Sequence, residues 1–371
     1  MTPASGQDRR NRLAIAAIAL VHAFVFVTMS TVLADHVTFR LTKDDGSPRK
    51  SIDGEILVEA ADGGIMIEGD DGQIWIVQPE QLIARESSEP PAPIDAAEMA
   101  QRRLAELPAG FEATMTAHYV ILHGGNETYA RQVGTLFESL YRGFFAYFKN
   151  GGIDLHEPTL PLVAIILPDR NQFRRHARSQ IGDTADHVIG YYHLPSNAMT
   201  TYRINNLERN IATLIHEATH QLSYNCGLQT RFADNPMWLA EGLAMFFESP
   251  DFSNPRGWRG IGRVNQVNLN RWQRYQRIRP ADSLRTLIAD DQRFRDSESA
   301  EAAYGEAWAL TYFLLKTRRS DFLGYLETLR EAERLRESTP RQRIETLERA
   351  LDTSLEELDD LFVRYMRRVR A

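Results

Sequence analysis

The chain lacks the groups that stabilise small disulfide scaffolds or bind nucleic acids. Cys226 is its only cysteine, so no internal disulfide bond can form and stability must come from a hydrophobic core. Hydrophobic residues make up 43% of the 371 residues, and a chain of this length and composition is typical of a globular protein with two domains. The net charge is −7, so the composition offers no basic surface and we expect no nucleic-acid partner. No internal repeat is evident.

The N-terminus has the three parts of an export signal. Three arginines within residues 9–12 precede an apolar run at 13–27, and the small residues of a cleavage site lie within 31–34. We therefore expect residues 1–34 to be a signal peptide and the protein to be exported to the periplasm, the cell envelope or the medium. Removal of three arginines and one aspartate would change the net charge from −7 to −9. The alternative is an uncleaved membrane anchor, because residues 13–33 are numerous enough to span a bilayer.

Residues 35–85 predict a small all-β domain. Apolar and polar residues alternate in three runs, at 54–59, 64–68 and 73–77. The runs are separated by Asp-Gly turns, in which glycine accepts positive φ. We expect three or four short strands that form an SH3-like barrel or an open sheet. Two roles remain open for this domain: a structural spacer, or the binding of a cell-envelope polymer or partner. The Pro-rich segment 86–95 predicts an extended linker.

Residues 96–371 predict a second, larger domain of the α+β class. The expected elements are a helix at 95–107, a strand at 118–123, a helix at 127–148, a strand at 162–167 and a hairpin at 187–193 and 199–203. The region after residue 258 is expected to be mostly helical, with a last helix at 354–365. On the hairpin, His193 and Tyr202 either face a cleft or belong to an ordinary strand surface.

The segment 211–220 contains the motif His-Glu-x-x-His inside a helical pattern of apolar residues. His216 and His220 are four residues apart, so both imidazoles project from one face of the helix and can hold one metal ion. Glu217 lies beside the first ligand, where its carboxylate can take a proton from a water molecule at the metal. This spacing is the signature of zinc proteases.

The third ligand is predicted on the next helix. Asn235 suits an N-cap and Pro236 suits the first turn, so a helix is expected to begin there. Its Glu241 follows His220 by 21 residues, which leaves room for a turn between two antiparallel helices. Two histidines and one glutamate form an open catalytic zinc set. Gly242 is expected to permit close approach of another helix.

Cys226 is the rival third ligand. It occupies the position of the third histidine in the pattern His-Glu-x-x-His-x-x-Gly-x-x-His, but Ser223 replaces the glycine of that pattern. Without the glycine the helix has no easy break that would turn the third ligand back. We therefore favour Glu241, and we expect Cys226 to be a small buried side chain.

The motifs His216-Glu-Ala-Thr-His220 and Trp238-Leu-Ala-Glu-Gly-Leu-Ala244 resemble those of the gluzincin metallopeptidases. More closely, the chain is similar to the bacterial peptidase-MA-like domains of uncharacterised function, because Tyr304-Gly-Glu-Ala-Trp-Ala-Leu310 matches a further segment of theirs. The resemblance extends from about residue 102 to the C-terminus and implies a zincin-like fold. It also implies that an edge strand beside the cleft pairs with the substrate backbone.

The resemblance further implies that a Tyr on a later helix, here Tyr304, stabilises the oxyanion. Thermolysin-type members have an Asp four residues after the ligand Glu, whereas this chain has Met245. The partner of His216 must therefore come from elsewhere, either Glu248 or a backbone carbonyl.

These residues predict a zinc-dependent peptidase with one zinc ion, in which Glu217 is the general base. Endopeptidase, aminopeptidase and self-processing activities all remain open. The alternative is an exported, non-catalytic binding or scaffold protein whose zinc site is structural or vestigial. A structural site would usually fill the fourth coordination position with protein, and this argues against the alternative.

Overall fold

The computed structural model describes residues 34–44, 46–249 and 261–370. The predicted signal peptide or anchor, except for Ala34, lies outside the described residues. None of the helices in the described ranges combines the length and apolar character that crossing a bilayer requires.

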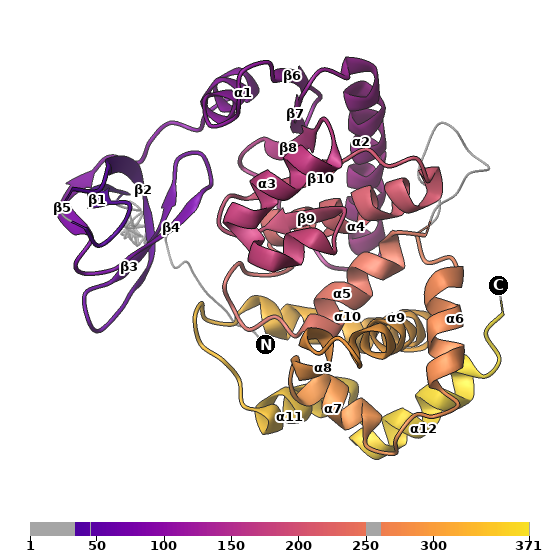
Figure 1. The fold of residues 1–371 in the computed structure, drawn as a ribbon. Helices are drawn as coiled ribbons and strands as arrows, with labels where there is room; N and C mark the ends of the chain where they lie inside the picture. Colours follow the sequence, from indigo (N-terminus) through magenta and orange to yellow (C-terminus); the bar gives the residue numbers. More distant parts are fainter. Residues whose placement is uncertain (1–33, 45, 250–260, 371) are drawn as a thin grey trace, which may run out of the picture. The chain divides into compact units, whose positions relative to one another are not determined.

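The first part of the chain is a five-stranded antiparallel sheet (Figure 1). Its strands are β1 (Ala34–Arg40), β2 (Arg49–Glu59), β3 (Ile65–Gly69), β4 (Ile74–Val77) and β5 (Leu82–Ser88), in the order β4-β3-β2-β1-β5. We expected three or four strands, whereas the sheet has five. β5 lacks the alternation of apolar and polar residues, but β1 has it, with Val37 and Phe39 buried, and our prediction did not use it. β5 ends at Ser88, inside the segment that we expected to be a linker.

The second part is built around a mixed five-stranded sheet. Its strands are β6 (Glu112–Met115), β7 (Tyr119–His123), β8 (Leu162–Leu167), β9 (Gly190–His193) and β10 (Ala198–Tyr202), in the order β6-β7-β8-β10-β9. β7, β8 and β10 are parallel to one another, whereas β6 and β9 run antiparallel at the two edges. β8 is the central strand and all six of its residues are buried.

Helices cover both faces of this sheet, because the side chains of each strand alternate between two cores. On one face Ile121, Ala164 and Met199 pack against α2 (Glu127–Lys149) and α4 (Leu207–Asn225). On the other face Val120, Val163 and Ala198 pack against α1 (Ala96–Ala105) and α3 (Arg170–Ile181), which a short 3₁₀ helix (Gly182–Asp186) follows. The sheet thus fixes α4 beside the edge strand β9.

The rest of the chain is helical, as expected. It contains α5 (Met237–Phe247), α6 (Gln266–Tyr275), α7 (Ser283–Ala289), α8 (Gln292–Arg295), α9 (Ala300–Thr317), α10 (Arg319–Arg330), α11 (Pro340–Leu351) and α12 (Leu355–Met366). α9 is almost wholly buried and packs against α5 and α6 (Figure 1). The fold is therefore of the predicted α+β class.

Gly242 allows α5 and α9 to approach closely, as predicted. A Cβ atom at this position would lie 2.1 Å from Oγ1 of Thr311 and 2.9 Å from the carbonyl oxygen of Ala307. Any larger residue would therefore push α5, which carries Glu241, away from α9.

The start of α5 differs from the prediction. The helix begins at Met237, so Pro236 and not Asn235 is the N-cap residue. The side chain of Asn235 instead donates hydrogen bonds to the carbonyl oxygens of Thr230 and Ala233, at 2.8 and 3.0 Å. A carboxylate from another part of the chain, Asp291, accepts from the backbone N–H of Met237 at 3.0 Å. A long-range partner thus replaces the local cap.

Candidate metal centre

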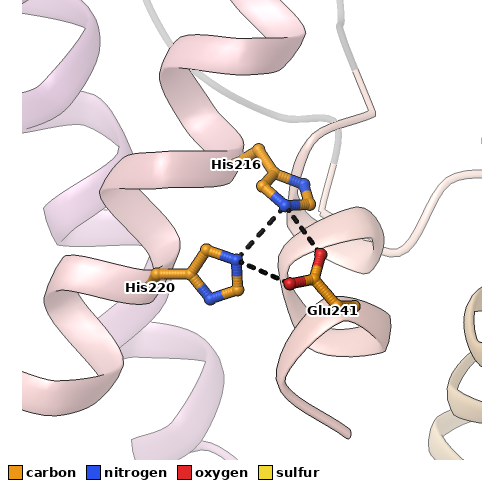
Figure 2. Close-up of side chains that lie close together, drawn as sticks. All are labelled: His216, His220 and Glu241. Atoms are coloured by element: carbon orange, nitrogen blue, oxygen red, sulfur yellow. Dashed lines mark hydrogen bonds and ion pairs between the residues drawn. The ribbon is translucent and has the colours of Figure 1, made fainter. Parts of the chain in front are cut away.

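α4 and α5 bring His216, His220 and Glu241 together at one point (Figure 2). Nε2 of His216 lies 3.2 Å from Nε2 of His220 and 3.1 Å from Oε2 of Glu241. Nε2 of His220 lies 3.7 Å from Oε1 of the same carboxylate. The three side chains are only 12–16% exposed, so little water competes with them.

The spacing of these atoms fits a metal ion. Two ligands that bind one zinc tetrahedrally at about 2.0–2.1 Å are about 3.3 Å apart, close to the distances between these three residues. Two imidazoles and one carboxylate are also ligand groups that zinc prefers in proteins. The group can therefore hold one metal ion, and no fourth His, Cys, Asp or Glu joins it among the described residues.

Cys226 does not belong to this group. It is fully buried at the end of α4, where its Sγ contacts the carbonyl oxygen of Ser223 at 3.8 Å. Burial raises the pKa of the Cys226 thiol to about 12, which disfavours the thiolate that binds metal. The structure thus brings together Glu241, and not Cys226, with the two histidines.

The partner of His216 is Glu248, one of the two alternatives from the sequence. Nδ1 of His216 donates to Oε2 of Glu248 at 2.9 Å, so Nε2 is the nitrogen that faces Glu241 and would bind a metal ion. The other carboxylate oxygen accepts from the side-chain amides of Asn265 and Asn268, at 2.7 and 3.2 Å. The two asparagines, which the sequence analysis missed, therefore orient Glu248 and, through it, the metal ligand.

The charges of the site shift the pKa values of its groups. Burial lowers the pKa of His216, but hydrogen bonds to Glu241 and Glu248 outweigh burial and raise it well above its usual value. Burial lowers the pKa of His220 to about 4, so this imidazole is neutral and can donate its lone pair. Burial by itself raises the pKa of Glu241, yet the two histidines bring it below its usual value.

Glu217 lies next to the metal group and contacts the edge strand. Its Oε2 accepts a hydrogen bond from the backbone N–H of Tyr192 in β9, at 2.8 Å. Burial raises the pKa of Glu217 to about 7. The backbone donor was not predictable from side-chain patterns, but it fixes the carboxylate relative to the strand.

Tyr304 approaches the site from α9. Its ring packs edge-on against Phe294, with the ring centroids 5.3 Å apart. The negative charge of Glu241, then burial and the charge of Glu217, raise the pKa of Tyr304. The hydroxyl of Tyr304 therefore stays protonated, and the charges of both Glu241 and Glu217 act on it.

Neither His193 nor Tyr202 reaches the metal group. Nδ1 of His193 lies 2.9 Å from Oγ of Ser196 in the β9–β10 turn. Tyr202 is buried in the core on the other face of the sheet, where its ring packs 4.9 Å from that of Phe173. Both residues lie in the predicted hairpin. Side chains of a strand alternate between the two faces of the sheet, and that of Tyr202 lies on the face away from α4.

Two cavities meet the metal group from different sides. The first, of about 780 Å³, is lined by His216 and Glu217 together with residues 187–190 and 263–267. The second, of about 490 Å³, is lined by His220 and Glu241 together with residues 232–235 and 335–337. Both volumes are typical of ligand pockets. His216 is thus accessible from the first cavity, and His220 and Glu241 are accessible from the second.

The site lies in the part of the chain that resembles a known family. Residues 210–335 match a family described as "Protein of unknown function (DUF1570)". No curated protein matches the chain. The matched region contains both histidines, Glu241 and Tyr304, and its description assigns them no function.

Proposed function

We propose that the chain is a zinc-dependent peptidase that hydrolyses peptide bonds with Glu217 as the general base. One observation carries the proposal: three ligand atoms with zinc-like spacing lie between two cavities, and a carboxylate that is not a ligand stands beside them. An open set of three protein ligands is typical of catalytic zinc sites.

Each residue has a separate role. When bound, zinc supplies Lewis acidity, which polarises a carbonyl group and lowers the pKa of a water molecule towards about 7. Glu217 accepts the proton of the attacking water and delivers it to the leaving amine. Tyr304 donates its hydroxyl proton in a hydrogen bond to the oxygen on which negative charge develops. Glu248 keeps His216 oriented during the reaction.

The position of β9 supports a peptide substrate. β9 is the edge strand of the sheet, and its Tyr192 contacts the base directly. Its outer edge offers backbone groups that an extended chain can pair with. We further propose that the protein acts after export, on peptides or proteins of the cell envelope or the medium. The N-terminal sheet would then serve as a spacer or bind an envelope partner.

The proposal is tested by metal analysis and by hydrolysis of a broad peptide mixture, with and without a chelator. The purified protein should contain one zinc ion, and its activity should disappear with the metal. The Glu217→Gln variant should retain zinc but lose at least about 10²-fold in hydrolysis, since the amide cannot accept the proton. If the wild-type protein and Glu217→Gln bind peptides equally well and neither cleaves them, the chain is a binding protein and not a peptidase. Equal cleavage by both forms would exclude Glu217 as the base.

A further inference from the structure

Arg271 lines the first cavity without an acidic partner. It lies on α6, is half-buried, and shares the cavity with His216 and Glu217. Its Nη1 donates to the amide oxygen Oδ1 of Asn268 at 2.9 Å. No carboxylate of the described residues forms an ion pair with its guanidinium. The charge is thus uncompensated by the protein, and most of the N–H donors of the guanidinium are open to a ligand.

Three other half-buried arginines of the helical region do have acidic partners. Arg279 and Arg293 both bind the buried carboxylate of Glu306, and Arg343 binds Asp234. Such a pair offsets the free-energy cost of removing the charge from water. An arginine that instead faces a cavity, with only a neutral amide beside it, is suited to bind an anion.

The carboxylates of the same cavity do not neutralise Arg271. Both oxygens of Glu248 are occupied by His216 and the two asparagines, and Glu217 accepts from the backbone of β9. Glu208 is exposed in the first turn of α4. The cavity is lined by three glutamates and three arginines, so a bound divalent ion would make it positive, even after its one ligand carboxylate is counted. The cavity therefore favours a negatively charged group.

Arg271 also lies close to Tyr304, the donor that we propose for the oxyanion. Gly305 permits this approach, because a Cβ atom there would lie 2.9 Å from Cβ of Arg271, where α6 packs against α9 (Figure 1). The charge of Glu241 and then burial raise the pKa of Tyr304, and the charge of Arg271 acts in the opposite direction. The guanidinium is therefore within electrostatic reach of the hydroxyl of Tyr304.

The leaving part of a substrate belongs on the Arg271 side of the metal group. Glu217 delivers a proton to the leaving amine, so this amine must come within hydrogen-bond distance of its carboxylate. Glu217 lines the first cavity, and it is not among the residues that line the second. In a C-terminal residue only Cα separates the carboxylate from that amine. With about 780 Å³, the first cavity has room for such a residue and for a longer leaving part.

We propose that Arg271 binds a carboxylate on the leaving side of the cleaved bond. The substrates are then peptides that are cleaved next to a free C-terminal residue or next to an Asp or Glu side chain. This assignment rests on the proposed peptidase function and names its substrate class. Both sources offer the same group, which the planar guanidinium can bind through two parallel hydrogen bonds.

Cleavage of matched peptides by the zinc-loaded protein tests the assignment and identifies the source of the carboxylate. One pair contains no Asp or Glu and differs only in a free or an amidated C-terminus. The second pair is amidated in both members and has Asp or Asn directly after the cleaved bond. In at least one pair kcat/KM should be at least about tenfold higher for the acid, since its neutral partner cannot form a charged hydrogen-bonded pair with Arg271. A preference in the first pair assigns a terminal carboxylate, and one in the second pair assigns a side chain.

Substitution of Arg271 shows whether this residue binds the carboxylate. In Arg271→Gln the ratio of kcat/KM for the acid over the neutral peptide should fall to near one, and Arg271→Lys should retain part of it. Arg274→Gln is the matched control and should keep the full ratio, because Arg274 is exposed on the same helix and pairs with Glu301 outside the cavity. An equal loss of kcat/KM for acid and neutral peptides in Arg271→Gln would make Arg271 a partner of the peptide backbone and overturn the assignment.

Binding of hydroxamates separates this assignment from the peptidase proposal. Zinc-loaded Glu217→Gln should bind the monohydroxamate of succinate or of glutarate at least about tenfold more tightly than the corresponding amide. The advantage of the acid should disappear in the Glu217→Gln/Arg271→Gln double variant. If no peptide is cleaved but this advantage is found, the peptidase proposal fails and the carboxylate site stands. If peptides are cleaved with equal kcat/KM for acid and neutral members, or if the acid preference survives in Arg271→Gln, the carboxylate site alone is overturned. Absence of both cleavage and the acid advantage would overturn both.

Discussion

Glu248 connects His216 to a pair of asparagines on the opposite side of its carboxylate. One oxygen lies 2.9 Å from Nδ1 of His216 and the other lies 2.7 Å from Nδ2 of Asn265. Since a carboxylate only accepts, Nδ1 of His216 carries a proton, and the lone pair of Nε2 would face a metal ion when one is bound. Glu248, which lies outside the group of His216, His220 and Glu241, thus fixes which nitrogen of His216 would face a metal ion.

Glu248→Gln should weaken zinc binding without abolishing it. A neutral amide is a poorer partner for Nδ1, and loss of such a partner typically costs about 10- to 100-fold in metal affinity. Competition with a chelator of known affinity measures the change. Glu208→Gln is the control, because Glu208 is an exposed carboxylate of the same cavity as Glu248 and should leave affinity unchanged. Equal affinity in both variants would show that Glu248 does not position His216.

Glu241 and Cys226 should respond in opposite ways to substitution. Glu241→Gln should lose most of its zinc affinity, because a neutral amide oxygen replaces a charged ligand. Cys226→Ala should keep zinc and lose only stability, by about 1 kcal/mol, since it removes one small buried side chain. Zinc content after dialysis and chemical denaturation measure the two effects. Retention of zinc by Glu241→Gln together with its loss from Cys226→Ala would reverse the ligand assignment.

Tyr304→Phe should lower kcat while zinc content and KM stay nearly unchanged. A donor that acts only on the developing oxyanion contributes to the transition state alone, and its loss typically costs about 10²- to 10³-fold. Tyr312→Phe is the control on the same helix, because burial and not a carboxylate of the site raises the pKa of Tyr312 most. A rise in KM with constant kcat would instead make Tyr304 a substrate-binding residue.

The sequence predicted the parts of the site that follow from helix periodicity. His216 and His220 share a face because they are one turn apart. Glu241 could be predicted as the third ligand from the pattern of the next helix. Glu248 lies seven residues after Glu241, at the C-cap of the same helix, and the sequence left it as one of two alternative partners of His216. These relationships involve two neighbouring helices and residues close in the chain.

Other parts of the site could not be predicted, because they depend on contacts between distant segments. Asn265 reaches Glu248 from α6, and the backbone of Tyr192 reaches Glu217 from β9. A backbone donor has no sequence signature, and Asn occurs in many surface turns. The same holds for the start of α5, where Asp291 replaced the local cap that Asn235 was expected to form.

The backbone of Leu335 has a φ of +59°, a left-handed conformation that the sequence could not show and that predicts an unusual order of stabilities. Leu335→Gly and Leu335→Ala lose nearly the same side-chain contacts, so their difference reports on the backbone. Alanine in the left-handed region costs about 1–2 kcal/mol, and the greater freedom of glycine in the unfolded chain costs about 0.5–1 kcal/mol. We therefore expect the glycine variant to unfold at higher denaturant, with a free energy of unfolding about 1 kcal/mol above that of the alanine variant.

Ile278 provides the reference for this comparison. It is 79% exposed and does not have positive φ. At this position only the unfolded-state cost of glycine applies, so Ile278→Ala should be more stable than Ile278→Gly by about 0.5–1 kcal/mol. Denaturant titrations of the Ala and Gly variants at positions 335 and 278 measure the four free energies of unfolding. If alanine is also the better residue at position 335, the backbone there is not strained.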